Sequence, residues 1–110
     1  LYMPSGTPEQ IEHLIQLQLA SASPEGAAKL RDILDDFDVS DILARVDAPV
    51  LLIHGHGDAV QPFEQSQMMA RHLKNATLVP LDTDSHVPLP HTPAWEVLMA
   101  ETERFLCRGA

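Results

Sequence analysis

Two groups of side chains of the kinds that bind metals or take part in catalysis follow apolar runs in the second half of this sequence. His54-Gly55-His56-Gly57-Asp58 comes directly after Val50-Leu51-Leu52-Ile53, and Asp84-Ser85-His86 comes after the run from Ala76 to Leu81. Imidazole and carboxylate groups are suitable zinc ligands. They are also the base and the orienting acid of nucleophilic catalysis. The sequence therefore raises two hypotheses, a metal site and a catalytic Asp–His pair.

The metal hypothesis rests on the spacing of His54, His56 and Asp58. This H-x-H-x-D pattern resembles the start of the H-x-H-x-D-H signature of metallo-β-lactamase-like hydrolases, and His86 and His91 could complete the set of ligands. Ala59, however, stands where that signature has its last histidine. The helical segments upstream also differ from the β-rich opening of that family. We therefore expect no metal at this position.

The catalytic hypothesis depends on the elements that would position Asp58 and His86. The run 50–53 is short, unbroken and apolar, as is typical of a strand buried on both faces in a parallel sheet. A helix from about 63 to 74, a second strand over 76–81 and a last helix from Thr92-Pro93 follow it. Parallel strands joined by a right-handed crossover have their carboxyl ends at one edge of the sheet. Asp58 and His86, 28 positions apart, should therefore lie at the same edge.

The first third of the chain is predicted to be helical. Thr7-Pro8-Glu9-Gln10 combines an N-cap threonine, a proline in the first turn and a glutamine three residues after the cap. Ser23-Pro24-Glu25 repeats this start signal for a helix that ends near Asp35, and 38–43 could form one helical turn. The chain thus divides into a helical segment, 1–46, and a strand-helix-strand-helix segment, 47–110.

The order of these elements resembles the C-terminal part of the α/β-hydrolase fold over about residues 38–107. The resemblance rests on the apolar strand, the Gly57-Asp58-x-x-x-Pro62 turn, the helix, the second strand, the His86 loop and the last helix. It implies an α/β fold class, with the C-terminal portion of an α/β-hydrolase-like parallel sheet preceded by cap-type helices. It also implies that Asp58 is the acid and His86 the base of a catalytic triad, with no metal or organic cofactor.

The sequence departs from the family pattern at the nucleophile. No G-x-S-x-G elbow occurs, no Gly-rich segment offers an oxyanion hole, and residue 85 is Ser where the family often has Gly. Two parallel strands do not form a stable sheet alone, and the chain begins at Leu1 rather than at a methionine. We therefore expect a fragment whose parent carries the nucleophile upstream, so that the 110 residues alone are inactive.

Charge and composition restrict the partners. The net charge of −9, from 16 acidic residues against 7 lysines and arginines, argues against binding to nucleic acid or to an anionic membrane surface. The longest apolar run is too short to span a bilayer. The single cysteine, Cys107, cannot form an internal disulfide, and no segment is typical of a signal peptide. These features favour a cytoplasmic location.

Two functions stay open at this point. The first is a serine hydrolase that acts on a small ester, amide or related molecule, bound with the help of the missing N-terminal half. The second is a non-catalytic ligand-sensing or interaction module, which in this family can be fused to a DNA-binding or cyclase domain. Exposed strand edges also predict association into a homodimer.

Overall fold

The structure is a computed structural model in which residues 2–108 are described. The chain divides into two compact units. One comprises Gly6–Asp41, and the other comprises Leu1–Ser5 together with Ile42–Ala110.

The first unit contains helices α1 (Pro8–Ser21) and α2 (Pro24–Asp35). Helix α1 begins with a complete capping box, in which the Thr7 side chain accepts from the Gln10 amide and the Gln10 side chain accepts from the Thr7 amide. Ser23 caps α2 in a similar way by accepting from the amide of Gly26. Neither helix has a buried residue, so local capping rather than burial accounts for where they begin.

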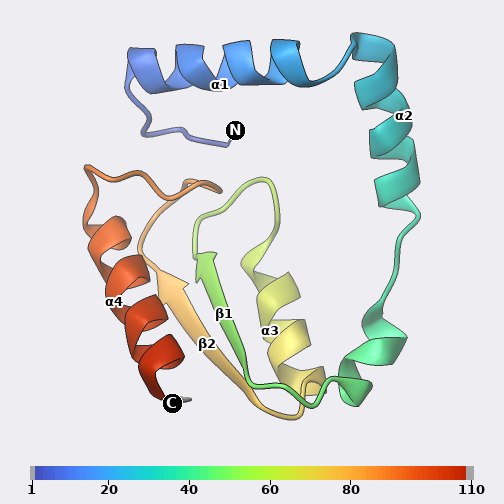
Figure 1. Cartoon of the computed structure of the whole chain (residues 1–110), viewed down its shortest axis with the longest axis vertical. Coiled ribbons are helices and arrows are strands. Elements are labelled where there is room, and N and C mark those ends of the chain that lie inside the picture. The colour runs from blue at the N-terminus through green and yellow to red at the C-terminus, as the bar shows by residue number, and fades with distance from the viewer. Residues whose placement is uncertain (1, 109–110) are drawn as a thin grey trace. The chain divides into compact units, whose positions relative to one another are not determined.

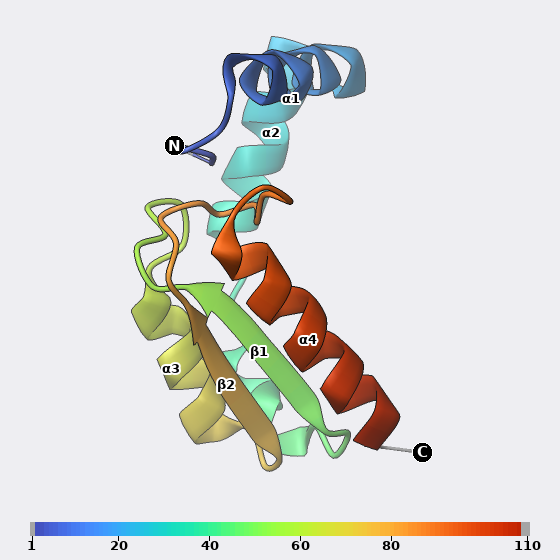
Figure 2. The same ribbon diagram turned by 90° about the vertical axis from the view of Figure 1, so that its left-hand side faces the viewer.

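The second unit is built on two parallel strands. Strands β1 (Val50–Gly55) and β2 (Ala76–Leu81) pair in register from Val50 opposite Ala76 to Gly55 opposite Leu81. Helix α3 (Phe63–His72) connects the strands, and α4 (Pro93–Arg108) follows β2. Each helix contacts both strands, and Figures 1 and 2 show α3 and α4 on opposite faces of the sheet. A short 3₁₀ helix, η1 (Ser40–Arg45), precedes β1.

The core of this unit is small, and Leu81 is the one buried apolar residue of the described chain that lies on a strand. Leu81 and Leu89 are 2% and 4% exposed, and the other buried apolar residues of the described chain are Met3, Leu43, Leu73 and Ala94.

None of the helices that the structure describes is long and apolar enough to cross a bilayer.

Burial differs from the sequence prediction in strand β1. Residues 50–54 of β1 are half-buried rather than buried on both faces, because a sheet of two strands has one helix on each face and an unpaired edge on each strand. Met99 and Leu106 keep the helical period of α4 but are 50% and 69% exposed. The sheet is too narrow to cover all the apolar side chains of this helix.

Candidate active site

Two loops meet at the carboxyl ends of β1 and β2. The amide of His56 donates to the carbonyl of Leu81 at 2.8 Å, and the amide of Gly57 donates to the carbonyl of Thr83 at 3.0 Å. These bonds extend the strand pairing by two residues and fix the loop after β1 against the loop after β2.

Gly55 permits this close approach. A Cβ atom at position 55 would lie only 3.1 Å from the carbonyl oxygens of Thr83 and Ser85 and 3.0 Å from the Thr83 methyl group. Both carbonyl oxygens belong to backbone that cannot move without shifting the whole loop. Glycine at the end of β1 therefore lets the segment that carries His86 lie directly against the segment that carries Asp58.

Asp58 is the most highly hydrogen-bonded side chain at this edge. Its Oδ1 atom accepts from the amides of Val60 at 2.7 Å and Gln61 at 3.1 Å. Its Oδ2 atom lies 2.7 Å from Nδ1 of His86. The side chain is only 3% exposed, so the loops hold a buried carboxylate in one orientation.

These contacts also determine the charge of Asp58. Burial by itself raises the pKa of a carboxyl group, but the hydrogen bonds from His86 and from the amides of Gln61 and Val60 outweigh it, together with the attraction of the imidazole. The net result is that the pKa of Asp58 lies below its ordinary value of 3.8. Asp58 is therefore ionised at neutral pH and can only accept hydrogen bonds.

His86 is held from both its backbone and its ring. Its amide donates to the carbonyl of Tyr2 at 2.7 Å, and the Tyr2 ring lies edge-on to the imidazole with the centroids 5.6 Å apart. Because the Asp58 carboxylate only accepts, Nδ1 of His86 must carry the proton. In a neutral ring Nε2 is then the acceptor, and the side chain is 36% exposed. The arrangement can therefore take a proton from a neighbouring hydroxyl group.

A second histidine contacts the same turn. Nε2 of His54, near the end of β1, lies 2.8 Å from the carbonyl oxygen of Gln61 and 3.4 Å from Oδ2 of Asp58. Its Nδ1 contacts the hydroxyl of Ser66, a buried residue on α3. Nothing in the sequence indicates Tyr2 or Ser66 as neighbours of the pair.

A cavity of about 470 Å³ opens beside the pair. Asp58, His86, His54 and Ser85 are among the polar residues that line it, and its apolar wall includes Ile53, Met69, Leu81 and Leu98. Ser85 is 3% exposed, and its hydroxyl has no hydrogen-bond partner among residues 2–108. The cavity thus combines an apolar surface with a few polar groups, as small-molecule sites do.

The residues of the metal hypothesis do not form a metal site in the structure. Within the described part of the chain, no group of three His, Cys, Asp or Glu side chains could hold a metal ion. The His56 ring packs against Phe63 instead, with a centroid separation of 4.9 Å. Of the H-x-H-x-D pattern, only His54 and Asp58 face each other.

Comparison with known proteins decides the family. A family model described as TAP-like protein, of the α/β-hydrolases, matches residues 31–106. That segment includes both strands and both loops of the site. The chain belongs to the α/β-hydrolase family.

Curated relatives of this α/β-hydrolase chain are enzymes by name. A pimeloyl-[acyl-carrier protein] methyl ester esterase of Neisseria meningitidis is 32% identical over 69% of the chain and 30% of the relative. A putative carbamate hydrolase, RutD, of Pseudomonas syringae is 39% identical over 61% of the chain and 28% of the relative. A 3-oxoadipate enol-lactonase of Acinetobacter baylyi is 36% identical over 74% of the chain and 30% of the relative.

The aligned segments span less than a third of the length of these relatives. No solved structure matches the chain significantly. The α/β-hydrolase assignment agrees with the fold and family predicted from the Gly57-Asp58 turn and the His86 loop.

Proposed function

We propose that this chain supplies the acid and base of a serine hydrolase that acts on a small carbonyl substrate. The observation that carries the proposal is the 2.7 Å contact between Oδ2 of the buried Asp58 and Nδ1 of His86. The two residues are 28 positions apart, and the contact forms at the edge where α/β proteins place their sites. Asp58 is the orienting acid in this proposal, and His86 is the general base.

The contacts of the pair support a definite sequence of proton transfers. Nε2 of His86 takes the proton of a serine hydroxyl while the serine oxygen bonds to the substrate carbonyl carbon. Asp58 holds the imidazole in the tautomer that leaves Nε2 free and stabilises the imidazolium. His86 then gives the proton to the leaving group as its bond to carbon breaks. Water repeats the cycle on the acyl intermediate and restores the serine.

The names of the relatives support the substrate class. They include an esterase, a carbamate hydrolase and an enol-lactonase. Ester, carbamate and lactone groups share a carbonyl carbon that a serine can attack. The mostly apolar wall of the cavity beside His86 fits the acyl part of such a molecule, and no metal or organic cofactor is needed for this chemistry.

The nucleophile comes from another segment in this proposal. None of the six serines of the chain lies in a G-x-S-x-G elbow, the strained turn that exposes the nucleophile in this family. The 110 residues alone should therefore not hydrolyse esters. The competing ligand-sensing function has the same Asp–His pair and differs in lacking a reactive serine.

The test is ester hydrolysis by the full-length polypeptide that carries this chain. Turnover of short p-nitrophenyl esters is measured for the wild type and for His86→Ala, with His72→Ala as the matched control, because His72 lies exposed on α3. The proposal predicts turnover that His86→Ala abolishes and His72→Ala leaves unchanged. Ester binding without turnover would favour the sensing function, and turnover that survives His86→Ala would overturn the proposal.

A further inference from the structure

The ring of His54 has both nitrogen atoms in contact with protein groups of defined chemistry. The Gln61 carbonyl, 2.8 Å from Nε2, can only accept a hydrogen bond. Nε2 therefore donates, and in the neutral ring Nδ1 accepts from the Ser66 hydroxyl. One neutral tautomer satisfies both partners. The side chain is 11% exposed, and the Phe63 ring lies edge-on to it with the centroids 5.6 Å apart.

Gln61 connects this ring to Asp58. The carbonyl of Gln61 accepts from His54, and the amide of the same residue donates to Oδ1 of Asp58 at 3.1 Å. The Asp58 carboxylate in turn accepts from His86. Hydrogen bonds and the backbone of Gln61 thus link Ser66 on α3 and His54 to Asp58 and His86, and Nε2 of His54 also lies 3.4 Å from Oδ2 of Asp58. Gln61 lies just before α3 begins.

We infer that His54 is a positioning residue for the catalytic pair: its imidazole anchors the Gln61 peptide to β1 and α3, and this holds the Asp58 carboxylate in line with His86. The inference rests on the proposed function for the roles of Asp58 and His86. It assigns His54 no hydrogen bond to the substrate, because its two ring nitrogens already bond to Ser66 and Gln61. Loss of the ring should let the turn shift, which costs turnover rather than substrate binding.

Two substitutions separate hydrogen bonding from ring volume. In His54→Gln the side-chain amide can place a donor near the position of Nε2 and still bond to Gln61. In His54→Asn the shorter side chain places its polar atoms near Nδ1, where they can reach Ser66 but not Gln61. His72→Ala serves as the control for loss of an imidazole elsewhere, because this exposed ring hydrogen-bonds to the carbonyl of Met68 in its own helix.

The experiment uses the full-length polypeptide with short p-nitrophenyl esters. We expect His54→Ala and His54→Asn to lower kcat by about 10- to 100-fold, as loss of a group that supports an active-site residue commonly does. KM should stay within about twofold of the wild type, and His54→Gln should recover most of kcat. The inference is wrong if His54→Asn retains as much kcat as His54→Gln, or if only KM changes.

A second readout does not need turnover. The proton shared by Asp58 and His86 should give a low-field proton NMR signal in the wild type, which His86→Ala removes. His54→Asn should shift or broaden this signal, and His54→Gln should keep it. If the wild type hydrolyses no ester, the proposed function fails, but the NMR comparison still decides the role of His54. An unchanged signal in a folded His54→Asn protein would overturn the inference.

Discussion

Two aspartates of this chain form similar turns but have different surroundings. Asp38 and Asp58 each accept from the amide two residues further on, at 2.9 and 2.7 Å, and each has a pKa below the ordinary value. The pKa of Asp38 falls because of the Ser40 hydroxyl and amide, which are its neighbours in the sequence. Asp38 lies exposed at the start of η1, where such a turn commonly stabilises a helix end.

Asp58 differs in its second oxygen and in its burial. Its Oδ2 atom bonds to His86, a residue from another loop, and its side chain is 3% exposed. The comparison shows that neither the turn nor a lowered pKa is enough to indicate a site. The partner that is distant in sequence and the loss of solvent distinguish the candidate catalytic carboxylate from the structural one.

The largest expected difference between the two aspartates is in turnover. In the full-length polypeptide, Asp58→Asn should lower kcat by about 10⁴-fold, because an amide at this position favours the wrong tautomer of His86. Asp38→Asn should leave ester turnover unchanged, since the partner of Asp38 is its sequence neighbour Ser40. Steady-state kinetics of the two variants test this. Equal losses in both variants would show that the comparison carries no functional meaning.

The second-largest effect on turnover is expected where the loops that follow β1 and β2 approach each other. Gly55→Ala places a methyl group about 3.1 Å from the backbone carbonyl oxygens of Thr83 and Ser85, so the loop that carries His86 must move away from Asp58. A displacement of this kind should reduce kcat by about 100-fold. Gly26→Ala in α2 is the matched control, because its methyl group would meet only the Ser23 side chain. Full activity of Gly55→Ala would mean that the loop contact does not position His86.

The negative charge of Asp58 should also contribute to the free energy of unfolding. Because its pKa is lower in the folded state, the ionised carboxylate stabilises the fold above the unfolded value near 3.8, and this contribution disappears as the pH falls through the folded pKa. Asp58→Asn should therefore cost about 1.5 to 3 kcal/mol at neutral pH, the usual range for a hydrogen bond to a charged group.

Urea unfolding of the wild type and Asp58→Asn at neutral pH and well below pH 3.8 measures this difference. The difference in free energy of unfolding between the two proteins should become smaller as the pH decreases. A gap that stays constant would mean that Asp58 is not ionised in the folded protein.

Two buried serines should give the smallest effects, with opposite signs. The Ser85 hydroxyl has no partner among the described residues, whereas the Ser66 hydroxyl contacts His54. Ser85→Ala should be neutral or raise the free energy of unfolding by up to about 1 kcal/mol, and Ser66→Ala should lower it by about 1 kcal/mol. Thermal unfolding of both variants decides this, and destabilisation by Ser85→Ala would indicate an additional partner for that hydroxyl.

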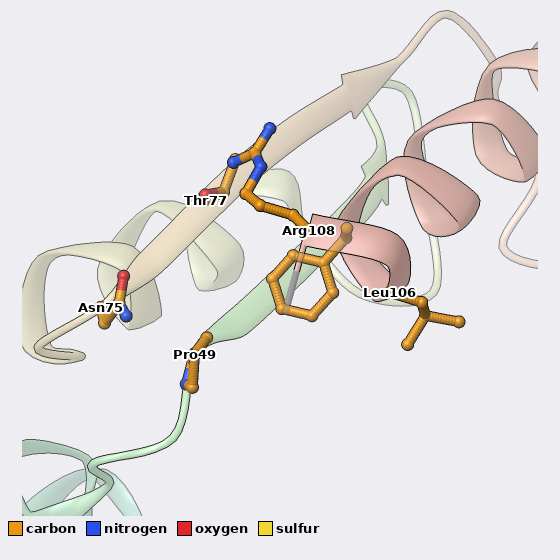
Figure 3. Close-up of a pocket in the computed structure, with 6 residues that line it drawn as sticks. Pro49, Asn75, Thr77, Leu106 and Arg108 are labelled. Carbon is orange, nitrogen blue, oxygen red and sulfur yellow. The ribbon is translucent and has the colours of Figure 1, made fainter. Parts of the chain in front are cut away.

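Cavity size would not have found the candidate site. A pocket of about 400 Å³ lies at the opposite end of the same sheet, where Pro49, Asn75, Thr77, Phe105, Leu106 and Arg108 line it (Figure 3). The pocket beside His86 is of similar size, about 470 Å³. Only the latter contains an interacting Asp–His pair, so the chemistry of the lining residues, rather than the volume, identifies it.

The sequence predicted the parts of the fold that depend on neighbouring residues or on a general rule of topology. The capping residues Thr7 and Ser23 located the starts of α1 and α2. Asp58 and His86 were placed at one edge because parallel strands end on the same side, and the structure brings them together. Their catalytic roles, the domain boundary at residue 46, the cytoplasmic location and association through strand edges stay predictions.

The remaining features depend on tertiary contacts that no local pattern encodes. The Tyr2 carbonyl accepts from the amide of His86, which is distant from it in the sequence. The residues around Tyr2 form no pattern that predicts this hydrogen bond. The role of His54 depends on the carbonyl of Gln61 and the hydroxyl of Ser66, which converge only once α3 has packed on β1. Exposure of Met99 depends on how much of α4 the sheet covers.

The most direct test of the Asp–His pair is labelling of the full-length polypeptide with a serine-directed fluorophosphonate probe, followed by mass spectrometry of the labelled peptide. We expect one labelled serine outside this 110-residue chain, with the labelling rate greatly reduced in His86→Ala and Asp58→Asn and unchanged in Asp38→Asn. Labelling that proceeds equally in all four proteins would contradict the proposal that Asp58 and His86 activate a serine. The absence of any labelled serine in the wild type would contradict it as well.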